Sequence, residues 1–190
     1  MAVVALYDAN VLYPNTLRDM LIRIAQTGLV QARWSQEILD ECLGALRRNR
    51  PDISGLRLDG LRYLMITAVR DWLVEGYEPL IPTLTLPDPE DRHVLAAAIG
   101  VGGQVLVTAN LADFPDEVLR QWRIAAMSPD DFLLEQVITD AAAVWHCVDR
   151  IATSRRRPPE SPEDVPTQLE RCGAGKAAAA LRGNWRTARR

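Results

Sequence analysis

The sequence predicts an α/β sandwich, with helices on both faces of a mainly parallel sheet, followed by a C-terminal helical extension. Two short runs, residues 3–7 and 104–108, are almost wholly apolar, as is typical of strands buried on both faces of a parallel sheet. Segments with helical periodicity separate these runs. The chain has 190 residues, 48% of them hydrophobic and 25% charged, which suffices for one domain with a sizeable core plus an extension.

The helices are predicted from apolar periodicity and from residues that start or stop a helix. Leu17, Leu21 and Ile24 share one helical face, and Gly28 follows them as a stop. Ser35 is expected to cap the next helix. In chain order, helices are predicted over residues 14–27, 35–48, 56–74 and 89–100, and a further helix opens at Ser128-Pro129.

Three strands are predicted, at residues 3–7, 104–108 and 123–127. In open parallel sheets, polar residues at the C-terminal ends of the strands form the ligand site. Asp8 follows the first strand and the segment 108–110 closes the second. We therefore expect these residues to meet at one edge of the sheet.

The last quarter of the chain differs in character from the rest. Residues 155–159 resemble a linker, and residues 161–190 predict one or two short helices. We therefore expect a body of residues 1–135 and an extension of residues 136–190. The extension begins with an apolar stripe at helical spacing, made of Val137, Ala141, Val144, Trp145, Val148 and Ile151.

The net charge of −3 hides an asymmetry between body and tail. Residues 151–190 hold nine basic and four acidic residues, whereas the rest of the chain holds 13 basic and 21 acidic residues. An acidic body with a basic tail bears on partners and not on fold. Lys176 is the only lysine, which excludes any mechanism that needs a lysine in the body.

The cysteines and the N-terminus indicate a cytoplasmic protein. Cys42, Cys147 and Cys172 are odd in number and lack CxxC spacing, so we expect buried thiols and no zinc site. No apolar run approaches the ~20 residues of a membrane span, so no membrane association is expected. The N-terminus has no basic segment of the kind that opens a signal peptide.

Two acidic positions stand out in the first half of the chain. Asp8 ends an apolar strand, where a carboxylate needs partners or a cation, although it could simply cap the next turn. In the helix at 35–48, Glu41 lies at the edge of the apolar arc and is expected to lean towards the sheet. Glu37 lies farther out and Asp40 farthest, and we expect both to face solvent.

Two more acids lie in the second half. Asp88 and Pro89 are a good helix start, with Asp91 placed for a reciprocal cap. Yet Asp91 shares its helical face with apolar residues and should point inward. His93 lies on the opposite side of the helical wheel, so we expect it at the surface or in a supporting position behind the site residues. Asp113 taken alone would be an ordinary loop acid.

Together these positions place three or four carboxylates near one sheet edge, beside the hydroxyl of Thr108 and the amides of Asn10 and Asn110. Clustered carboxylates repel, and a hard divalent cation removes that repulsion. All-oxygen ligation favours Mg²⁺ or Mn²⁺ over zinc. The natural chemistry of such a site is metal-assisted phosphodiester hydrolysis.

Two stretches carry a resemblance to PIN-domain nucleases, in particular to the VapC-like toxins of type II toxin–antitoxin pairs. They are Asp88-Pro89-Glu90-Asp91-Arg92-His93-Val94-Leu95-Ala96-Ala97-Ala98 and Thr108-Ala109-Asn110-Leu111-Ala112-Asp113-Phe114-Pro115. The resemblance spans about residues 1–135 and implies a PIN-like fold. By it, Asp8, Glu41 and Asp91 match the acidic site residues of the family, and either Asp113 or Asn110 completes the set.

The resemblance also implies a function. It predicts a Mg²⁺- or Mn²⁺-dependent endoribonuclease that is silenced by a cognate antitoxin and that could form a homodimer. The alternatives are an inactive PIN-like module that binds RNA or protein, or a nuclease of other nucleic-acid processing. A phosphatase with an aspartyl nucleophile needs an acid at the position of Asn10 and a lysine in the body. A phosphoreceiver domain needs an early acidic pair and the same lysine. The absence of these residues argues against both classes.

The basic tail offers two interpretations. Its arginines and lysine could attract RNA, with Trp185 stacking on a base. Alternatively, the tail packs on the body or grips the antitoxin, and Trp185 belongs to a core or docking surface. The basic residues concerned are Arg155, Arg156, Arg157, Arg171, Lys176, Arg182, Arg186, Arg189 and Arg190.

Overall fold

A five-stranded, fully parallel sheet forms the centre of the protein, in the order β3-β2-β1-β4-β5. The computed structural model describes residues 2–188, with side chains described for residues 2–183. The predicted α/β sandwich around a parallel sheet is confirmed. The strands are β1 (Val3–Tyr7), β2 (Val30–Ser35), β3 (Leu73–Val74), β4 (Val105–Val107) and β5 (Ala125–Met127).

Two of these strands are absent from the sequence-based prediction. In β2, buried Val30, Ala32 and Trp34 alternate with more polar residues, so the segment lacks the continuous apolar run of a central strand. The predicted helix over 56–74 is wrong beyond residue 68, because the backbone becomes extended at Val69 and leads into the two-residue β3. So short a strand exists only through its pairing with β2.

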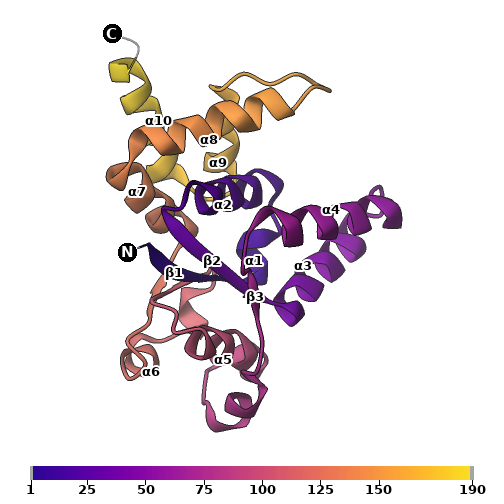
Figure 1. Ribbon diagram of the computed structural model, residues 1–190, viewed down its shortest axis with the longest axis vertical. Helices are drawn as coiled ribbons and strands as arrows, with labels where there is room; N and C mark the ends of the chain where they lie inside the picture. The colour runs from indigo at the N-terminus through magenta and orange to yellow at the C-terminus, as the bar shows by residue number, and fades with distance from the viewer. Residues whose placement is uncertain (1, 189–190) are drawn as a thin grey trace.

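Helices cover both faces of the sheet (Figure 1). α2 lies on one face, with the C-terminal helices stacked beyond it, and α5 lies on the other. The strands point towards α1 and α3, and α3 pairs with α4. The α-helices are α1 (Ala9–Leu12), α2 (Asn15–Thr27), α3 (Gln36–Asn49), α4 (Gly55–Ala68), α5 (Arg92–Gly100), α6 (Asp116–Arg120), α7 (Pro129–Thr139), α8 (Ala141–Ser154), α9 (Asp164–Arg171) and α10 (Gly175–Ala188). Short 3₁₀ helices are η1 (Glu78–Thr83), η2 (Pro89–Asp91) and η3 (Leu111–Asp113).

Several predicted helix boundaries are confirmed by local contacts. Gly28 ends α2 with φ of 85°, a conformation that favours glycine. The Ser35 and Ser128 side chains each accept a hydrogen bond from the backbone N–H three residues later, which caps α3 and α7. Asp88 caps η2 by accepting from the N–H of Glu90 at 2.9 Å, but the predicted reciprocal cap by Asp91 does not form.

An aromatic cluster joins the sheet to the C-terminal part. Tyr7 stacks on Trp34 at 6.4 Å between ring centroids, and Phe132 of α7 meets Tyr7 edge-on at 5.9 Å. These rings are fully buried. The division predicted at residue 135 falls inside α7, which contributes to the sheet's own core, so a boundary there stays a prediction.

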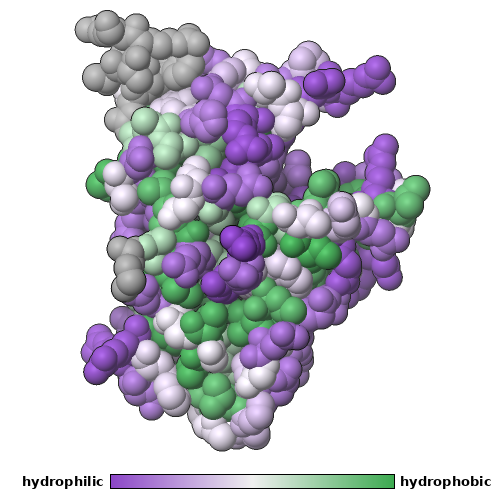
Figure 2. Space-filling view, viewed as in Figure 1, coloured by the Kyte–Doolittle hydropathy of each residue, from purple (hydrophilic) through white to green (hydrophobic). Residues whose placement is uncertain are grey.

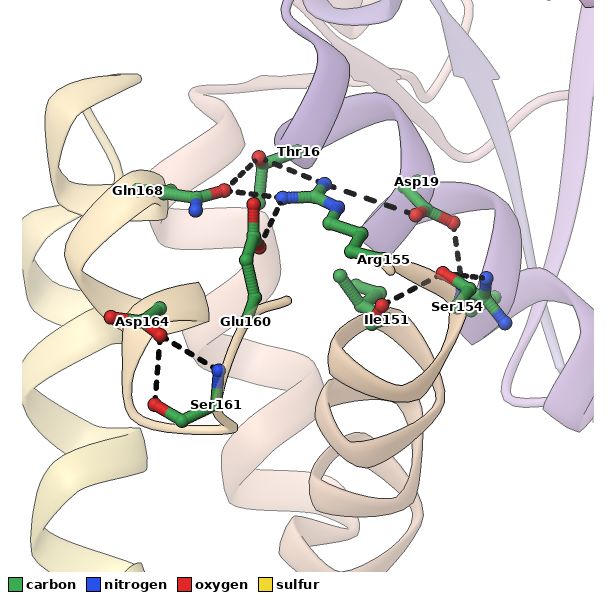
Figure 3. Close-up of polar contacts among 10 residues, drawn as sticks. Thr16, Asp19, Ile151, Ser154, Arg155, Glu160, Ser161, Asp164 and Gln168 are labelled. Atoms are coloured by element: carbon green, nitrogen blue, oxygen red, sulfur yellow. Dashed lines mark hydrogen bonds and ion pairs between the residues drawn. The ribbon is translucent and has the colours of Figure 1, made fainter. Parts of the chain in front are cut away.

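Arg155 makes polar contacts that join the C-terminal helices to the body (Figure 3). Its guanidinium donates to Glu160 at 2.8 Å, to Gln168 of α9 and to Thr16 of α2 at 3.1 Å, and it lies 3.9 Å from Asp19. The side chain of Arg155 is only 15% exposed. The segment predicted as a linker therefore begins with a largely buried residue, Arg155, that bonds both α2 and α9.

Other basic residues of the tail are also paired. Lys176 lies 2.6 Å from Asp131 and Arg182 lies 2.7 Å from Glu170. The pairing of these two residues and of Arg155 fits the interpretation in which the tail packs on the body. Arg156, Arg157 and Arg171 are exposed. The side chains of Trp185, Arg186, Arg189 and Arg190 lie outside the described part of the structure.

α4 exposes several large hydrophobic side chains, and green atoms lie among paler and purple ones in the region of this helix in Figure 2. Leu56, Tyr63 and Leu64 are 83%, 65% and 63% exposed.

Within residues 2–188, no helix is both long and apolar enough to cross a membrane. Of the three free thiols, Cys42 and Cys147 are buried as expected, whereas Cys172 is half-buried.

Candidate active site

Asp8 is held at the carboxyl edge of the sheet by the segments that follow β1 and β4. Tyr7 and Val107 are paired across these parallel strands, so the next residues, Asp8 and Thr108, meet. Thr108 Oγ1 donates a hydrogen bond of 2.7 Å to Asp8 Oδ2, and Asn10 Nδ2 donates one of 2.6 Å to the same oxygen. These two bonds fix the orientation of a carboxylate that is only 5% exposed.

The supporting residues are themselves held in place. Asn10 Nδ2 also donates to Thr108 Oγ1 at 3.0 Å, and Asn10 Oδ1 accepts from the N–H of Ala109 at 3.0 Å. The N–H of Asn110 donates to Thr108 Oγ1 at 3.0 Å, so Asn110 contributes through its backbone. The predicted supporting positions Asn10, Thr108 and Asn110 thus form one hydrogen-bonded network around Asp8.

Asp91 lies near both Asp8 and Asp113, and Asp91 and Asp113 each end a short 3₁₀ helix. Burial raises the pKa of Asp91 to about 6, with further contributions from the negative charges of Asp8, Asp113 and Asp88. Burial also raises the pKa of Asp8, partly offset by its hydrogen bond from Thr108 and increased by the charge of Glu41. The predicted acids are therefore close enough to repel one another.

Glu41 reaches the same region from α3 and contacts His93. His93 Nε2 lies 3.1 Å from Glu41 Oε1, and its Nδ1 lies 3.6 Å from Glu37 Oε2. Burial alone lowers the pKa of His93, but the hydrogen bond to Glu41 and the charges of Glu41, Glu37 and Asp8 together raise it. The prediction that His93 lies at the surface is wrong, because its side chain is only 7% exposed; a supporting position beside a site acid fits its contacts.

The two remaining acids of α3 behave differently. Asp40 faces outward as expected, where it pairs with Arg62. Glu37 is half exposed, yet it accepts a hydrogen bond of 3.3 Å from Tyr77 Oη and lies against His93. The expectation of a fully solvated Glu37 is therefore only partly correct.

The donor set suits a hard divalent cation. Four carboxylates from different segments gather at the edge, namely Asp8, Glu41, Asp91 and Asp113, and oxygen ligands of this kind favour Mg²⁺ or Mn²⁺. In residues 2–188, no three carboxylate, imidazole or thiol side chains surround a common point in a metal-binding arrangement. Burial, and to a smaller extent neighbouring carboxylates, raises the pKa values of Asp8 and Asp91, and a bound cation would lower both.

A groove beside this edge includes residues that the sequence analysis does not single out. It runs between α1 and α3 and is lined by Asn10, Tyr13, Glu41, Arg48 and Asn49, among others. The helical spacing of Glu41 and Arg48, seven residues apart, is the one sequence signal that places them on the same face of α3.

Two family models match different parts of the chain. A PIN domain model matches residues 4–112, and a model of the VapC50 C-terminal domain matches residues 129–183. The PIN match includes Asp8, Glu41 and Asp91 and ends one residue before Asp113.

A curated protein of Mycobacterium tuberculosis (strain ATCC 25618 / H37Rv), named "Putative ribonuclease VapC50", is 48% identical to this chain over 62 residues. That match covers 33% of this chain and 36% of the relative, so it spans about a third of each protein. No solved structure matches the chain. The parallel sheet, the acids at its carboxyl edge and the match over residues 4–112 lead to one conclusion: this chain belongs to the PIN-domain family.

Proposed function

We propose that this protein is a Mg²⁺- or Mn²⁺-dependent endoribonuclease, the toxin of a type II toxin–antitoxin pair, acting in the cytoplasm. The proposal is supported by the proximity of Asp8 to Glu41 and Asp91, and of Asp91 to Asp113, since these neighbouring carboxylates add to the rise in pKa that burial causes. The name of the relative, a ribonuclease, and the PIN domain support RNA as the substrate.

The cation would be held by Asp8 and Asp91, with Glu41 and Asp113 completing the acidic set. When bound, such a cation supplies a Lewis acid that lowers the pKa of water and stabilises charge developing on phosphate. Thr108 and Asn10 restrain Asp8 by bonding one of its oxygens. His93 restrains Glu41 in the same way and brings a partial counter-charge to the cluster.

A protein partner is part of the proposal. The exposed leucines and tyrosine of α4 form an apolar surface of the kind that binds another protein. We propose that the cognate antitoxin covers it, and self-association of the chain through this surface would contradict this assignment. Size-exclusion chromatography with light scattering, alone and with the product of the neighbouring reading frame, tests this, and Leu64→Glu should weaken the association.

The catalytic proposal is tested with single-stranded RNA and the purified full chain. Cleavage should require Mg²⁺ or Mn²⁺ and stop with chelator. Asp8→Asn should lower activity by roughly 10²-fold or more, whereas Asp40→Asn, a charge change on the outer face of α3, should leave it unchanged. Undiminished cleavage in chelator would refute metal dependence, and metal-dependent RNA binding without cleavage would favour the inactive-module alternative.

A further inference from the structure

The groove between α1 and α3 begins at the acidic edge and leads away from it. Asn10 and Glu41 belong to both the groove and the candidate active site. Farther along, the groove is lined by Tyr13, Arg48 and Asn49. A second groove shares Tyr13 and continues past Arg50 and Arg57 at the junction of α3 and α4. Tyr13 therefore lies between the two grooves, and Arg48 is the basic residue that lines the groove next to the carboxylates.

The phase of α3 explains why an acid and a base lie along one groove. Glu41, Ala45 and Arg48 follow at spacings of four and three residues, so they lie on one face of the helix. Seven residues of α-helix advance about 10 Å along the axis. Arg48 is thus near the acids without being part of their cluster.

Arg48 is a cation without a partner. Within the described residues no acid pairs with it, whereas neighbouring Arg50 pairs with Asp52 at 2.6 Å. The Arg48 guanidinium lies back over Gly44, since its Nη1 is 3.4 Å from where a Cβ at that position would stand. Gly44 is one turn closer to Glu41, so the guanidinium is displaced along α3 in the direction of Glu41.

We propose that this groove receives the single-stranded RNA next to the cleaved bond, with Arg48 binding a backbone phosphate. The inference rests on the proposed ribonuclease function. Arginine binds phosphate through paired N–H groups, which suits an unpaired guanidinium on an acidic body. Tyr13, half-buried in the groove wall, offers a ring on which an unpaired base can stack. Arg155, Lys176 and Arg182 of the tail are, by contrast, ion-paired with acidic residues.

The test is the cleavage of a labelled single-stranded RNA by the full chain in Mg²⁺, with KM and kcat measured over a range of salt. Arg48→Gln should raise KM roughly tenfold at low salt, the effect of losing one charge-assisted hydrogen-bonding group, with kcat within about twofold. The slope of log(1/KM) against log salt should flatten by about 0.7, the value for one phosphate contact on a single strand. Arg48→Lys should recover most of the slope and only part of the affinity.

Arg47→Gln is the matched control, because Arg47 is an exposed neighbour with the same charge that does not line the groove. If Arg48→Gln and Arg47→Gln give the same KM and salt slope while the wild type cleaves, the groove proposal is overturned and the ribonuclease proposal stands. If the wild type does not cleave, the ribonuclease proposal fails. Fluorescence anisotropy with the same RNA then decides the groove, since equal affinities of the two variants would overturn it.

Discussion

The contacts of Arg155 predict that this side chain stabilises the packing of the C-terminal helices on the body. Arg155→Gln removes the charge and keeps much of the length. Hydrogen bonds are lost to Glu160 and Gln168, and one to Thr16. Glu160, whose side chain is 18% exposed, is left without its cation.

The magnitude follows from the type of contact. A hydrogen bond to a charged group contributes about 1.5–3 kcal/mol net, and bonds that share one side chain are not additive. Glutamine can retain one of the contacts, so the loss in unfolding free energy should be about 3 kcal/mol. In a protein of this size, that lowers Tm by roughly 6–12 °C.

The assay is thermal unfolding followed by circular dichroism, with Arg156→Gln as the control. Arg156 is the next residue, is exposed and makes no side-chain ion pair in the described part of the chain, so its substitution should change stability by less than about 0.5 kcal/mol. Hydrogen exchange should show faster exchange in α9 for Arg155→Gln. Equal Tm values for the two variants would refute the stabilising role of the Arg155 contacts.

Three further predictions concern the acidic site. Glu41→Gln should abolish most RNA cleavage while Asp40→Asn does not, and the reverse result would show that the orientation assigned to α3 is wrong. Thr108→Val removes the 2.7 Å hydrogen bond to Asp8 and should lower apparent Mg²⁺ affinity by roughly 10–100-fold in a metal titration; unchanged affinity would contradict a positioning role. Burial and neighbouring carboxylates raise the pKa of Asp91 from 3.8 to about 6. The protonated carboxyl therefore contributes to the stability of the metal-free fold at low pH, and that contribution is lost as the pH rises through about 6. In chelator, Asp91→Asn should therefore have a higher Tm than the wild type above pH 6, and the difference should shrink towards pH 4; a difference independent of pH would exclude the repulsion.

The order of acids along the chain could be predicted because their positions are tied to local signals. An apolar run identifies β1 and so places Asp8 at a strand end, and the same holds for β4 and Thr108. The apolar arc of α3 separates Glu41 from Asp40. These assignments need only the period of a helix or a strand, which is written in neighbouring residues.

His93 shows where a helical wheel stops being informative. The wheel assumes one buried face, but α5 is buried nearly all round, from His93 to Ala98. The sheet covers one side, while α3 brings Glu41 and Glu37 to the other. Only the packing of α5 between distant segments makes His93 a partner of the site.

Periodicity and capping act over a few residues, so they suffice to predict the fold class, the strand ends and the acids that follow them. Which charged side chains lie close together, by contrast, is seen only in the tertiary structure. Arg155 is bound to α2 and α9, whereas Arg48 stays unpaired beside the groove, although both are arginines of the same acidic protein. The partners of a charged side chain lie many residues away in the chain, and their positions follow only from the packing of the helices on the sheet.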